Sequence, residues 1–157
     1  MTSDASRRLP PAASGVPVTD VMARPVVTVD PDMGLLDLMR LFVTAGIGGA
    51  PVVDATGTPI GVVSKTDLLR ELYDQAGSAT RAPLEPGPEQ PTGPKARDIM
   101  TASPVVVTEG ASLSHAAGIM AQEHLHRVYV TDQRGAITGV LSASDIVHWL
   151  ANEDGDA

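Results

Sequence analysis

Apolar residues occur along this chain in short runs and at helical spacing, in an order that predicts alternating strands and helices. Residues 25–29 form a short run rich in β-branched side chains, which predicts a strand. Apolar side chains then recur at helical spacing from Leu35 to Phe42, behind a helix-start signal at residues 30–32. The chain therefore begins its ordered part with a strand followed by a helix.

A pair of strands and a second helix complete the first half. Apolar runs at residues 50–53 and 60–63 flank the turn-forming segment 54–58, so we expect them to form two strands joined by a turn. A further helix is expected to begin at Ser64, because leucines follow it at helical spacing. The first half has the order β-α-β-β-α.

The second half repeats both the order and the motifs. Asp-Val-Met at residues 20–22 returns as Asp-Ile-Met at 98–100, a shift of 78 residues, and the same shift carries Asp67 to Asp145. The expected elements of the second half are a strand at 105–107, a helix at 112–123, strands at 128–130 and 137–141, and a helix at 142–150.

A repeated segment is usually one supersecondary unit that cannot bury its apolar face alone and stacks on its copy. We therefore expect an α+β, sandwich-like fold of two β-α-β-β-α units packed by pseudo-twofold symmetry, with two equivalent crevices between them. The expected boundaries are a disordered tail at 1–16, one domain at 17–75, a Pro/Gly-rich linker at 76–95, a second domain at 96–151 and an acidic tail at 152–157.

Composition and charge narrow the classes of function. The net charge of −8 and the sequence pI of about 4.7 oppose binding to a phosphate backbone, so a nucleic-acid partner is disfavoured. The absence of cysteine excludes disulfides, thiolate catalysis and cysteine-ligated metals. No apolar run approaches the ~20 residues that span a bilayer. We expect a cytoplasmic protein without a membrane partner.

The strongest candidates for binding residues lie where a strand is expected to end and a helix to begin. Ser64 and Asp67 occupy this position in the first half, and Ser142 and Asp145 in the second. Ser-x-x-Asp at a helix start is a capping box, which satisfies free backbone N–H groups. The same helix end suits a phosphate, and the carboxylate beside it can accept both hydroxyls of a ribose. The cap and the ligand site are compatible interpretations.

Taken together, these paired motifs resemble a tandem pair of cystathionine-β-synthase-type (CBS) domains, also called a Bateman module. In the first half the resemblance rests on residues 20–29, 50–54 and 61–67. In the second half it rests on residues 98–101, 125–132 and 139–145. It covers about residues 18–150 apart from the linker. Because both copies match, the resemblance is specific.

The resemblance implies a module that senses an adenosine-containing ligand such as AMP, ADP, ATP or S-adenosylmethionine. In this family the aspartate that closes the motif binds ribose hydroxyls, and the hydroxyl residues before it lie close to the ligand. Adenine would lie in an apolar slot on the first strand of each unit. The positions implied are Asp67 and Asp145 for ribose, Ser64, Thr66, Ser142 and Ser144 beside them, Val27 and Val106 for adenine, and Thr101 near the nucleoside.

Phosphate recognition is expected to differ between the halves. His126 and Arg127 resemble the His-Arg pair that contacts phosphates in the γ subunit of AMP-activated kinase, and arginine is a planar, permanently charged donor. The alternative is a surface charge at a strand start and a solvated loop histidine. The first half has Gly48 and Gly49 at the equivalent positions. Lys65, Arg24 and Arg97 are candidates to compensate.

Other functional centres are weakly supported. His124 and His126 could ligate a metal, but no carboxylate cluster accompanies them. Trp149 and Phe42 are interpreted as core or interface anchors, and His115 as solvated. No spacing supports a catalytic triad and no glycine-rich phosphate loop is present, so we expect no enzymatic activity and no bound cofactor.

Two principal hypotheses follow. The first is a stand-alone regulatory protein whose ligand shifts its shape or its binding to a partner that the sequence does not name. The second is a ligand-free interaction module in which the Ser-x-x-Asp pairs are caps alone. Under the first hypothesis we expect a homodimer, because Leu36, Leu41 and Val43 lie on helix faces that one sheet cannot all cover. The resemblance implies a disc of four CBS units for such a dimer.

Overall fold

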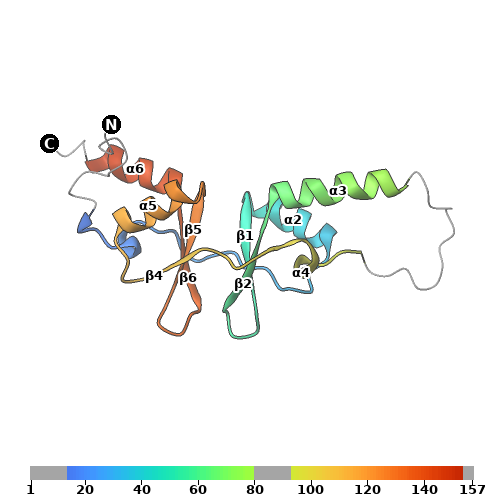
Figure 1. Cartoon of the computed structure of the whole chain (residues 1–157), viewed down its shortest axis with the longest axis horizontal. Helices are drawn as coiled ribbons and strands as arrows, with labels where there is room; N and C mark the ends of the chain where they lie inside the picture. The colour runs from blue at the N-terminus through green and yellow to red at the C-terminus, as the bar shows by residue number, and fades with distance from the viewer. Residues whose placement is uncertain (1–13, 80–92, 154–157) are drawn as a thin grey trace. The chain divides into compact units, whose positions relative to one another are not determined.

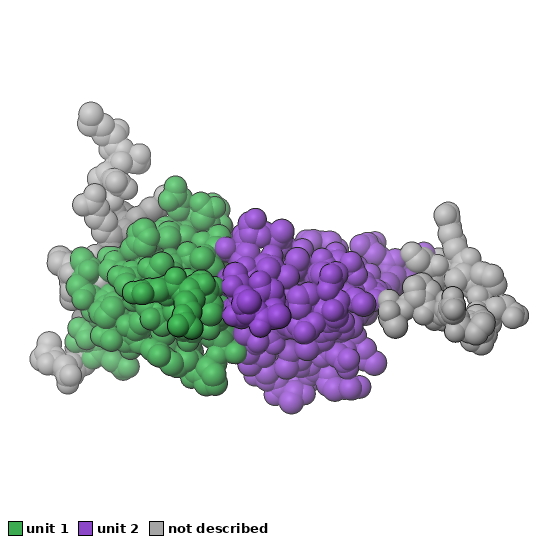
Figure 2. Space-filling view, turned by 90° about the horizontal axis from the view of Figure 1, so that it is seen from below, with its two compact units in different colours: residues 1–26, 105–157 green, residues 27–104 purple. Residues whose placement is uncertain are grey.

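The computed structural model describes residues 14–79 and 93–153. Outside the described residues lie 1–13, 80–92 and 154–157, which are parts of the expected N-terminal tail, linker and acidic tail. The chain divides into two compact units (Figure 2). Unit 1 combines Met1–Val26 with Val105–Ala157, and unit 2 is Val27–Pro104. Each unit therefore contains a short segment from the beginning of one repeat and most of the other repeat.

Unit 2 is a three-stranded sheet with helices (Figure 1). Its elements are α2 (Leu35–Ala45), β1 (Gly49–Val53), β2 (Pro59–Ser64), α3 (Lys65–Ala79), α4 (Ala96–Ile99) and β3 (Thr101–Ala102). The strand order is β1-β2-β3 and both pairings are antiparallel. Helices α2 and α3 lie on the same side of this sheet (Figure 1). The two-strand pairing expected around residues 54–58 is confirmed.

Unit 1 has the corresponding architecture. Its elements are the 3-10 turn η2 (Val18–Asp20), β4 (Val106–Thr108), α5 (Leu113–Gln122), β5 (Arg127–Thr131), β6 (Ile137–Ser142) and α6 (Ala143–Glu153). Strand β4 runs parallel to β5, and β5 pairs with β6 antiparallel. The helices and strands expected for the second half are confirmed to within about two residues at most ends, and α6 extends to Glu153. The α+β class is confirmed in both units.

Each unit has its own apolar core between its sheet and its helices. In unit 2 the core contains Leu38 and Phe42 of α2, Val52 and Val63 of the sheet, and Leu68 of α3. Alternate residues of β2 are buried, whereas three consecutive residues of β1 are buried. In unit 1 the buried residues are Val18, Met22, Val107, Leu113, Ala116, Met120, Val128, Val130, Leu141 and Ile146. Trp149 packs against this core from its rim.

The segment that opens each repeat packs on the sheet of the other repeat, which the sequence did not predict. Met22 lies against Gly139, and Met100 lies against Gly61, so closely that neither glycine has room for a side chain. A Cβ on Gly61 would come within 2.8 Å of the Met100 Cγ and 3.0 Å of the Thr101 backbone oxygen. Glycine is required at these two positions because a neighbouring side chain occupies the space where a Cβ would lie.

The strand expected at residues 25–29 is reduced to one bridge, between Val29 and Val52. In unit 1 the corresponding strand β4 forms fully, and the Tyr129 N–H points to the Val105 oxygen at 3.5 Å. The residue equivalent to Tyr129 is Pro51, which has no N–H to donate. The missing donor explains why the first repeat forms less of this strand.

The helix-start signal at residues 30–32 forms a turn instead. The Asp32 N–H donates to the Asp30 carboxylate at 2.8 Å, which is a local side-chain turn that competes with helix. Helix α2 begins at Leu35 behind an extended Gly34 that makes no side-chain cap. It ends at Ala45, and the φ of 65° at the following Gly46 is the left-handed conformation typical of a residue that terminates a helix.

Candidate functional site

The paired serine and aspartate of the first repeat lie at the junction of β2 and α3. The Ser64 N–H and hydroxyl donate to Asp67 Oδ2 at 2.8 and 2.9 Å, and the Asp67 N–H donates to the Ser64 Oγ at 3.2 Å. These hydrogen bonds fix both side chains on the first turn of α3 and confirm the predicted capping box. The remaining Asp67 oxygen lies 3.8 Å from the Arg70 guanidinium.

The second repeat builds the same arrangement at the start of α6. The Ser142 N–H donates to Asp145 Oδ2 at 2.8 Å, and the Asp145 N–H donates to the Ser142 Oγ at 3.1 Å. Both aspartates are half-buried, so each carboxylate is held in place while part of it remains accessible. A fixed carboxylate beside free helix N–H groups is suited to a ligand that carries both hydroxyl and anionic groups.

Strand register brings Arg127 beside this site in unit 1. Arg127 of β5 pairs directly with Ser142 of β6, and the His126 oxygen accepts a 2.8 Å hydrogen bond from the first N–H of α6. In unit 2 the same places are taken by Gly49, which pairs with Ser64, and by Gly48. The register therefore confirms that residues 126–127 and 48–49 are equivalent, and only unit 1 has the guanidinium.

Tyr129 is a buried residue next to this site that sequence reasoning missed. It follows Arg127 by two residues on β5, so both side chains are on the same face of the strand. Burial raises the pKa of the Tyr129 phenol, and the nearby Arg127 guanidinium partly opposes this. The hydroxyl makes no hydrogen bond of good geometry among the described residues. Its spacing of two residues from Arg127 could have indicated that both side chains lie on the same face of a strand.

The residues implied for the base and the nucleoside lie in the same two units as the capping boxes. They are more widely spaced than the serine and aspartate of each box. Val106 of β4 pairs with Tyr129, and Thr101 of β3 pairs with Val62, two residues before the end of β2. Val27 precedes Val29, the residue that bridges to β1. Because Val107 and Val29 occupy equivalent places opposite β5 and β1, the register makes Thr28, rather than Val27, the equivalent of Val106.

The exposed hydroxyls of Thr66 and Ser144 follow the caps by two residues, on the first turns of α3 and α6. Unit 2 therefore holds Val27, Ser64, Thr66, Asp67 and Thr101. Unit 1 holds Val106, His126, Arg127, Ser142, Ser144 and Asp145.

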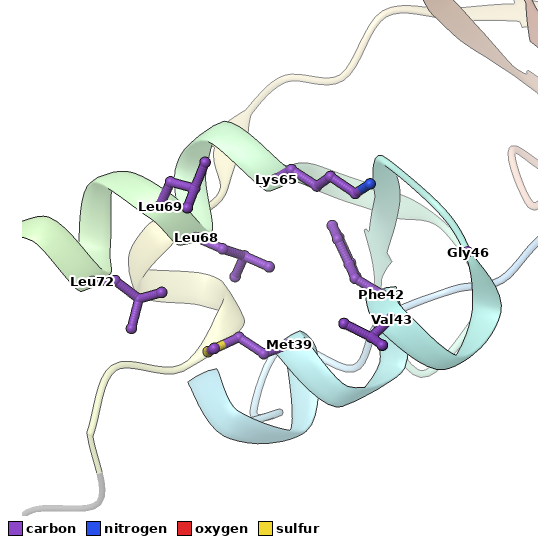
Figure 3. A pocket seen from close by; sticks show the side chains of 8 residues that line it. All are labelled: Met39, Phe42, Val43, Gly46, Lys65, Leu68, Leu69 and Leu72. Carbon is purple, nitrogen blue, oxygen red and sulfur yellow. The ribbon is translucent and has the colours of Figure 1, made fainter.

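The basic residues expected to compensate for Gly48 and Gly49 are differently placed. Arg97 forms an ion pair with Asp32, and Lys95 lies 3.7 Å from the same carboxylate. Arg24 donates to the Thr19 oxygen at 3.4 Å. Lys65 lines a groove between α2 and α3 (Figure 3). Arg97 is already paired, so it is not an uncommitted phosphate ligand.

The histidines and the helices of the described residues bear on metal clusters and membrane-spanning segments. Residues 14–79 and 93–153 contain no group of three or more histidine and acidic side chains placed to hold a metal. His115, His124 and His126 are all exposed. Within the same ranges no helix combines the length and apolarity needed to cross a bilayer.

The capping pairs, the two three-stranded sheets and the repeat spacing agree with a single family. The family model described as CBS domain matches residues 18–74 and again 96–152. The chain therefore belongs to the CBS domain family and carries two copies of that domain.

Relatives with known structures or names share this organisation. The crystal structure of CBSX2 in complex with AMP superposes with a TM-score of 0.73 at 28% identity, covering 89% of this chain and 99% of that one. CBSX2 is a CBS-pair protein from Arabidopsis thaliana. An uncharacterised protein of Methanocaldococcus jannaschii is 24% identical over 152 residues, covering 85% of this chain and 90% of its own length.

A third relative is a larger protein. The inosine-5'-monophosphate dehydrogenase of Mycobacterium tuberculosis is 30% identical over 135 residues, which are 83% of this chain but 22% of the dehydrogenase. The likeness thus covers a minor part of that protein.

Proposed function

We propose that this chain is a CBS-pair regulatory protein that senses an adenosine-containing ligand, with AMP, ADP and ATP as first candidates and S-adenosylmethionine as the alternative. The ligand would shift the protein's shape or its binding to a partner, since a ligand signals only when it binds two states unequally. We further propose a homodimer that acts in the cytoplasm and has no enzymatic activity of its own.

One observation carries the proposal. In unit 1 the Asp145 carboxylate, the Ser142 hydroxyl and the Arg127 guanidinium come from adjoining ends of β5, β6 and α6. A carboxylate for ribose hydroxyls beside a guanidinium for phosphate matches the two polar ends of a nucleotide. The AMP complex of CBSX2, at 28% identity, supports the same ligand class.

The two units are proposed to bind with unequal affinity. Unit 2 has Gly48 and Gly49 in place of the His-Arg pair, and its Asp67 is already near Arg70. The residue equivalent to Arg70 in unit 1 is His148. Unit 1 therefore offers the freer carboxylate and the additional cation, and is proposed as the stronger site.

Calorimetric titration of the protein with AMP, ADP, ATP, S-adenosylmethionine and adenosine tests the proposal. We expect at least one of these to bind, with a nucleotide tighter than adenosine. GMP is the matched control for the base. If none binds at millimolar concentration, or if GMP binds as tightly as AMP, the adenosine-sensor proposal is wrong.

The alternative is a ligand-free interaction module, and one observation favours it. The serine and aspartate of each box already satisfy one another through hydrogen bonds of 2.8 to 3.2 Å, so caps alone explain their presence. The same titration distinguishes the two functions, because a module without ligand stays unbound across the whole panel.

A further inference from the structure

The Tyr129 hydroxyl is a buried polar group whose presence the proposed ligand contacts do not explain. Tyr129 is 3% exposed, and its hydroxyl oxygen makes no hydrogen bond of good geometry among the described residues. A buried hydroxyl without a partner costs free energy, because folding removes the water that it would otherwise bind. The surroundings of this hydroxyl indicate what it contributes in return.

Tyr129 lies on the face of the unit 1 sheet that is turned away from the helices. Its neighbours on β5, Val128 and Val130, belong to the apolar core together with residues of α5 and α6. Successive residues of a strand point to opposite faces of the sheet. Tyr129 and Arg127 therefore share the face opposite to that core.

The strand register places Tyr129 among the residues proposed to hold the ligand. Val106 of β4 and Val140 of β6 both pair with Tyr129. In the next row of the same face, Ser142 of β6 pairs with Arg127. Side chains of residues that pair across strands lie on the same face. The phenol is thus on the central strand, between the residue proposed for the base and the row that holds the guanidinium.

The Arg127 guanidinium is a charged group that acts on this phenol. Burial raises the pKa of Tyr129, and the charge and the N–H donors of Arg127 oppose that rise. A phenolic oxygen can accept a hydrogen bond, whereas a guanidinium only donates. The hydroxyl can therefore hold one N–H of the guanidinium and leave other N–H groups for a phosphate, which binds arginine through two parallel hydrogen bonds.

Unit 2 provides an internal control for this pair of side chains. Its equivalents of Arg127 and Tyr129 are Gly49 and Pro51, so the guanidinium and the phenol are missing together. Pro51 is less than 2% exposed, although it has no polar side-chain atom. Packing at this place on the sheet therefore does not require a hydroxyl. Of the two units, the one with the arginine is the one with the hydroxyl.

We propose that Tyr129 is a positioning residue, whose hydroxyl accepts a hydrogen bond from the Arg127 guanidinium in the nucleotide complex and holds that group toward the phosphate. The inference rests on the proposed nucleotide site of unit 1. It assigns the phosphate affinity of that site to two residues, of which only Arg127 touches the ligand.

Calorimetric titration of Tyr129→Phe with whichever of AMP, ADP and ATP binds the wild type most tightly tests the proposal. Phenylalanine keeps the ring and removes only the hydroxyl, so the packing is retained. We expect nucleotide affinity to fall by about 3- to 10-fold, as for the loss of one hydrogen bond, and adenosine affinity to change much less. Unchanged nucleotide affinity, or equal losses for nucleotide and adenosine, overturns the positioning role alone. A wild type that binds none of the three nucleotides overturns the proposed phosphate site itself.

A double-mutant cycle with Arg127→Gln separates positioning from a direct contact with the ligand. In the Arg127→Gln background, Tyr129→Phe should change nucleotide affinity by less than about twofold, because the group that it positions is gone. A larger loss in that background shows that the hydroxyl contacts the ligand directly, and overturns the proposal.

Titration of the phenol tests the contact without any ligand. Tyr73→Phe leaves Tyr129 as the single tyrosine of the chain. In this background Arg127→Gln should raise the pKa of Tyr129 further, because it removes the charge that lowers it, whereas Arg134→Gln should change it little. The absorbance of the ionised phenol at alkaline pH measures both variants. A pKa of Tyr129 that responds equally to the two substitutions, or to neither, overturns the contact.

Discussion

Arg127 is the residue that most clearly separates the two halves of the molecule. Its strand position beside Ser142 places a permanent positive charge at the proposed site of unit 1, where unit 2 has a glycine. If Arg127 binds phosphate, its loss should weaken only ligands that carry phosphate. If Arg127 is only a surface charge, its loss should not distinguish ligands with and without phosphate.

Arg127→Gln should therefore weaken AMP binding while leaving adenosine binding nearly unchanged. A charge-assisted hydrogen bond contributes about 1.5–3 kcal/mol, which corresponds to roughly a 10- to 150-fold loss of affinity. Calorimetry with both ligands measures the difference. Arg134→Gln, a change in the loop between β5 and β6, is the control for charge alone. Equal losses for AMP and adenosine would exclude a phosphate contact.

The burial of Tyr129 predicts how the free energy of unfolding changes in alkaline solution. Its pKa is raised by burial, so the folded chain holds the phenolic proton at pH values where the unfolded chain has lost it. The resulting stability is present below the unfolded value of about 10 and declines as the pH rises through the higher folded value.

Urea unfolding at pH 8 and pH 10.5 tests this. We expect Tyr129→Phe to lose less stability than the wild type between the two pH values. Equal losses in the two proteins would contradict the assignment.

At the scale of the elements, two glycine–methionine contacts hold the first segment of each repeat against a sheet. Gly61 of β2 and Gly139 of β6 lie where a Cβ would meet Met100 and Met22 respectively. The clash is with side chains, so part of it can be relieved by movement of the methionine, at the cost of its packing.

Gly61→Ala and Gly139→Ala should each lower the free energy of unfolding by about 1–3 kcal/mol. Gly118→Ala is the matched control, because this helical glycine has open space around it and alanine favours the helix by about 1 kcal/mol. Chemical denaturation measures all three. Met100→Ala should cost less stability in the Gly61→Ala background than in the wild type, because it also removes the clash, and equal costs in the two backgrounds would contradict the steric explanation.

The elements show which part of the fold the sequence encodes locally. Short apolar runs and helical spacing predicted most strands and helices of both repeats, and Ser64 and Asp67 predicted a capping box because its residues are three apart. The contact of Met22 with Gly139 joins residues far apart in the sequence, and no local period encodes it. The shortened strand near Val29 depended on Pro51 in a different strand. Tyr129 was missed because its burial depends on tertiary packing.

At the scale of the whole molecule, the first segment of each repeat belongs to the compact unit that contains most of the other repeat. Neither repeat alone therefore contains a complete compact unit. Unit 1 requires residues from both ends of the chain, and unit 2 extends from Val27 to Pro104. Met22 and Val18 belong to the core of unit 1, while Ala96 belongs to the core of unit 2. Cooperative folding of the two repeats is the expected consequence.

Cleavage between the repeats tests this dependence. A protease site placed within residues 80–92 should yield two fragments that stay associated and keep a single unfolding transition. Each fragment expressed alone should lack a stable core, because its sheet lacks the methionine segment of the other. Size exclusion and thermal circular dichroism report both. Two independently folded fragments would show that the exchanged segments are dispensable.

The aspartate at the start of α6 is proposed to hold the adenosine-containing ligand. The most direct test is calorimetric titration of AMP into Asp145→Asn, with Asp67→Asn as the matched variant in unit 2. Asparagine keeps an oxygen that can accept the Ser142 N–H, so the cap is retained while the carboxylate is lost. We predict at least a tenfold loss of the strongest AMP affinity in Asp145→Asn and little change of that affinity in Asp67→Asn. Tight AMP binding that is unchanged in Asp145→Asn would contradict a ligand site at Asp145.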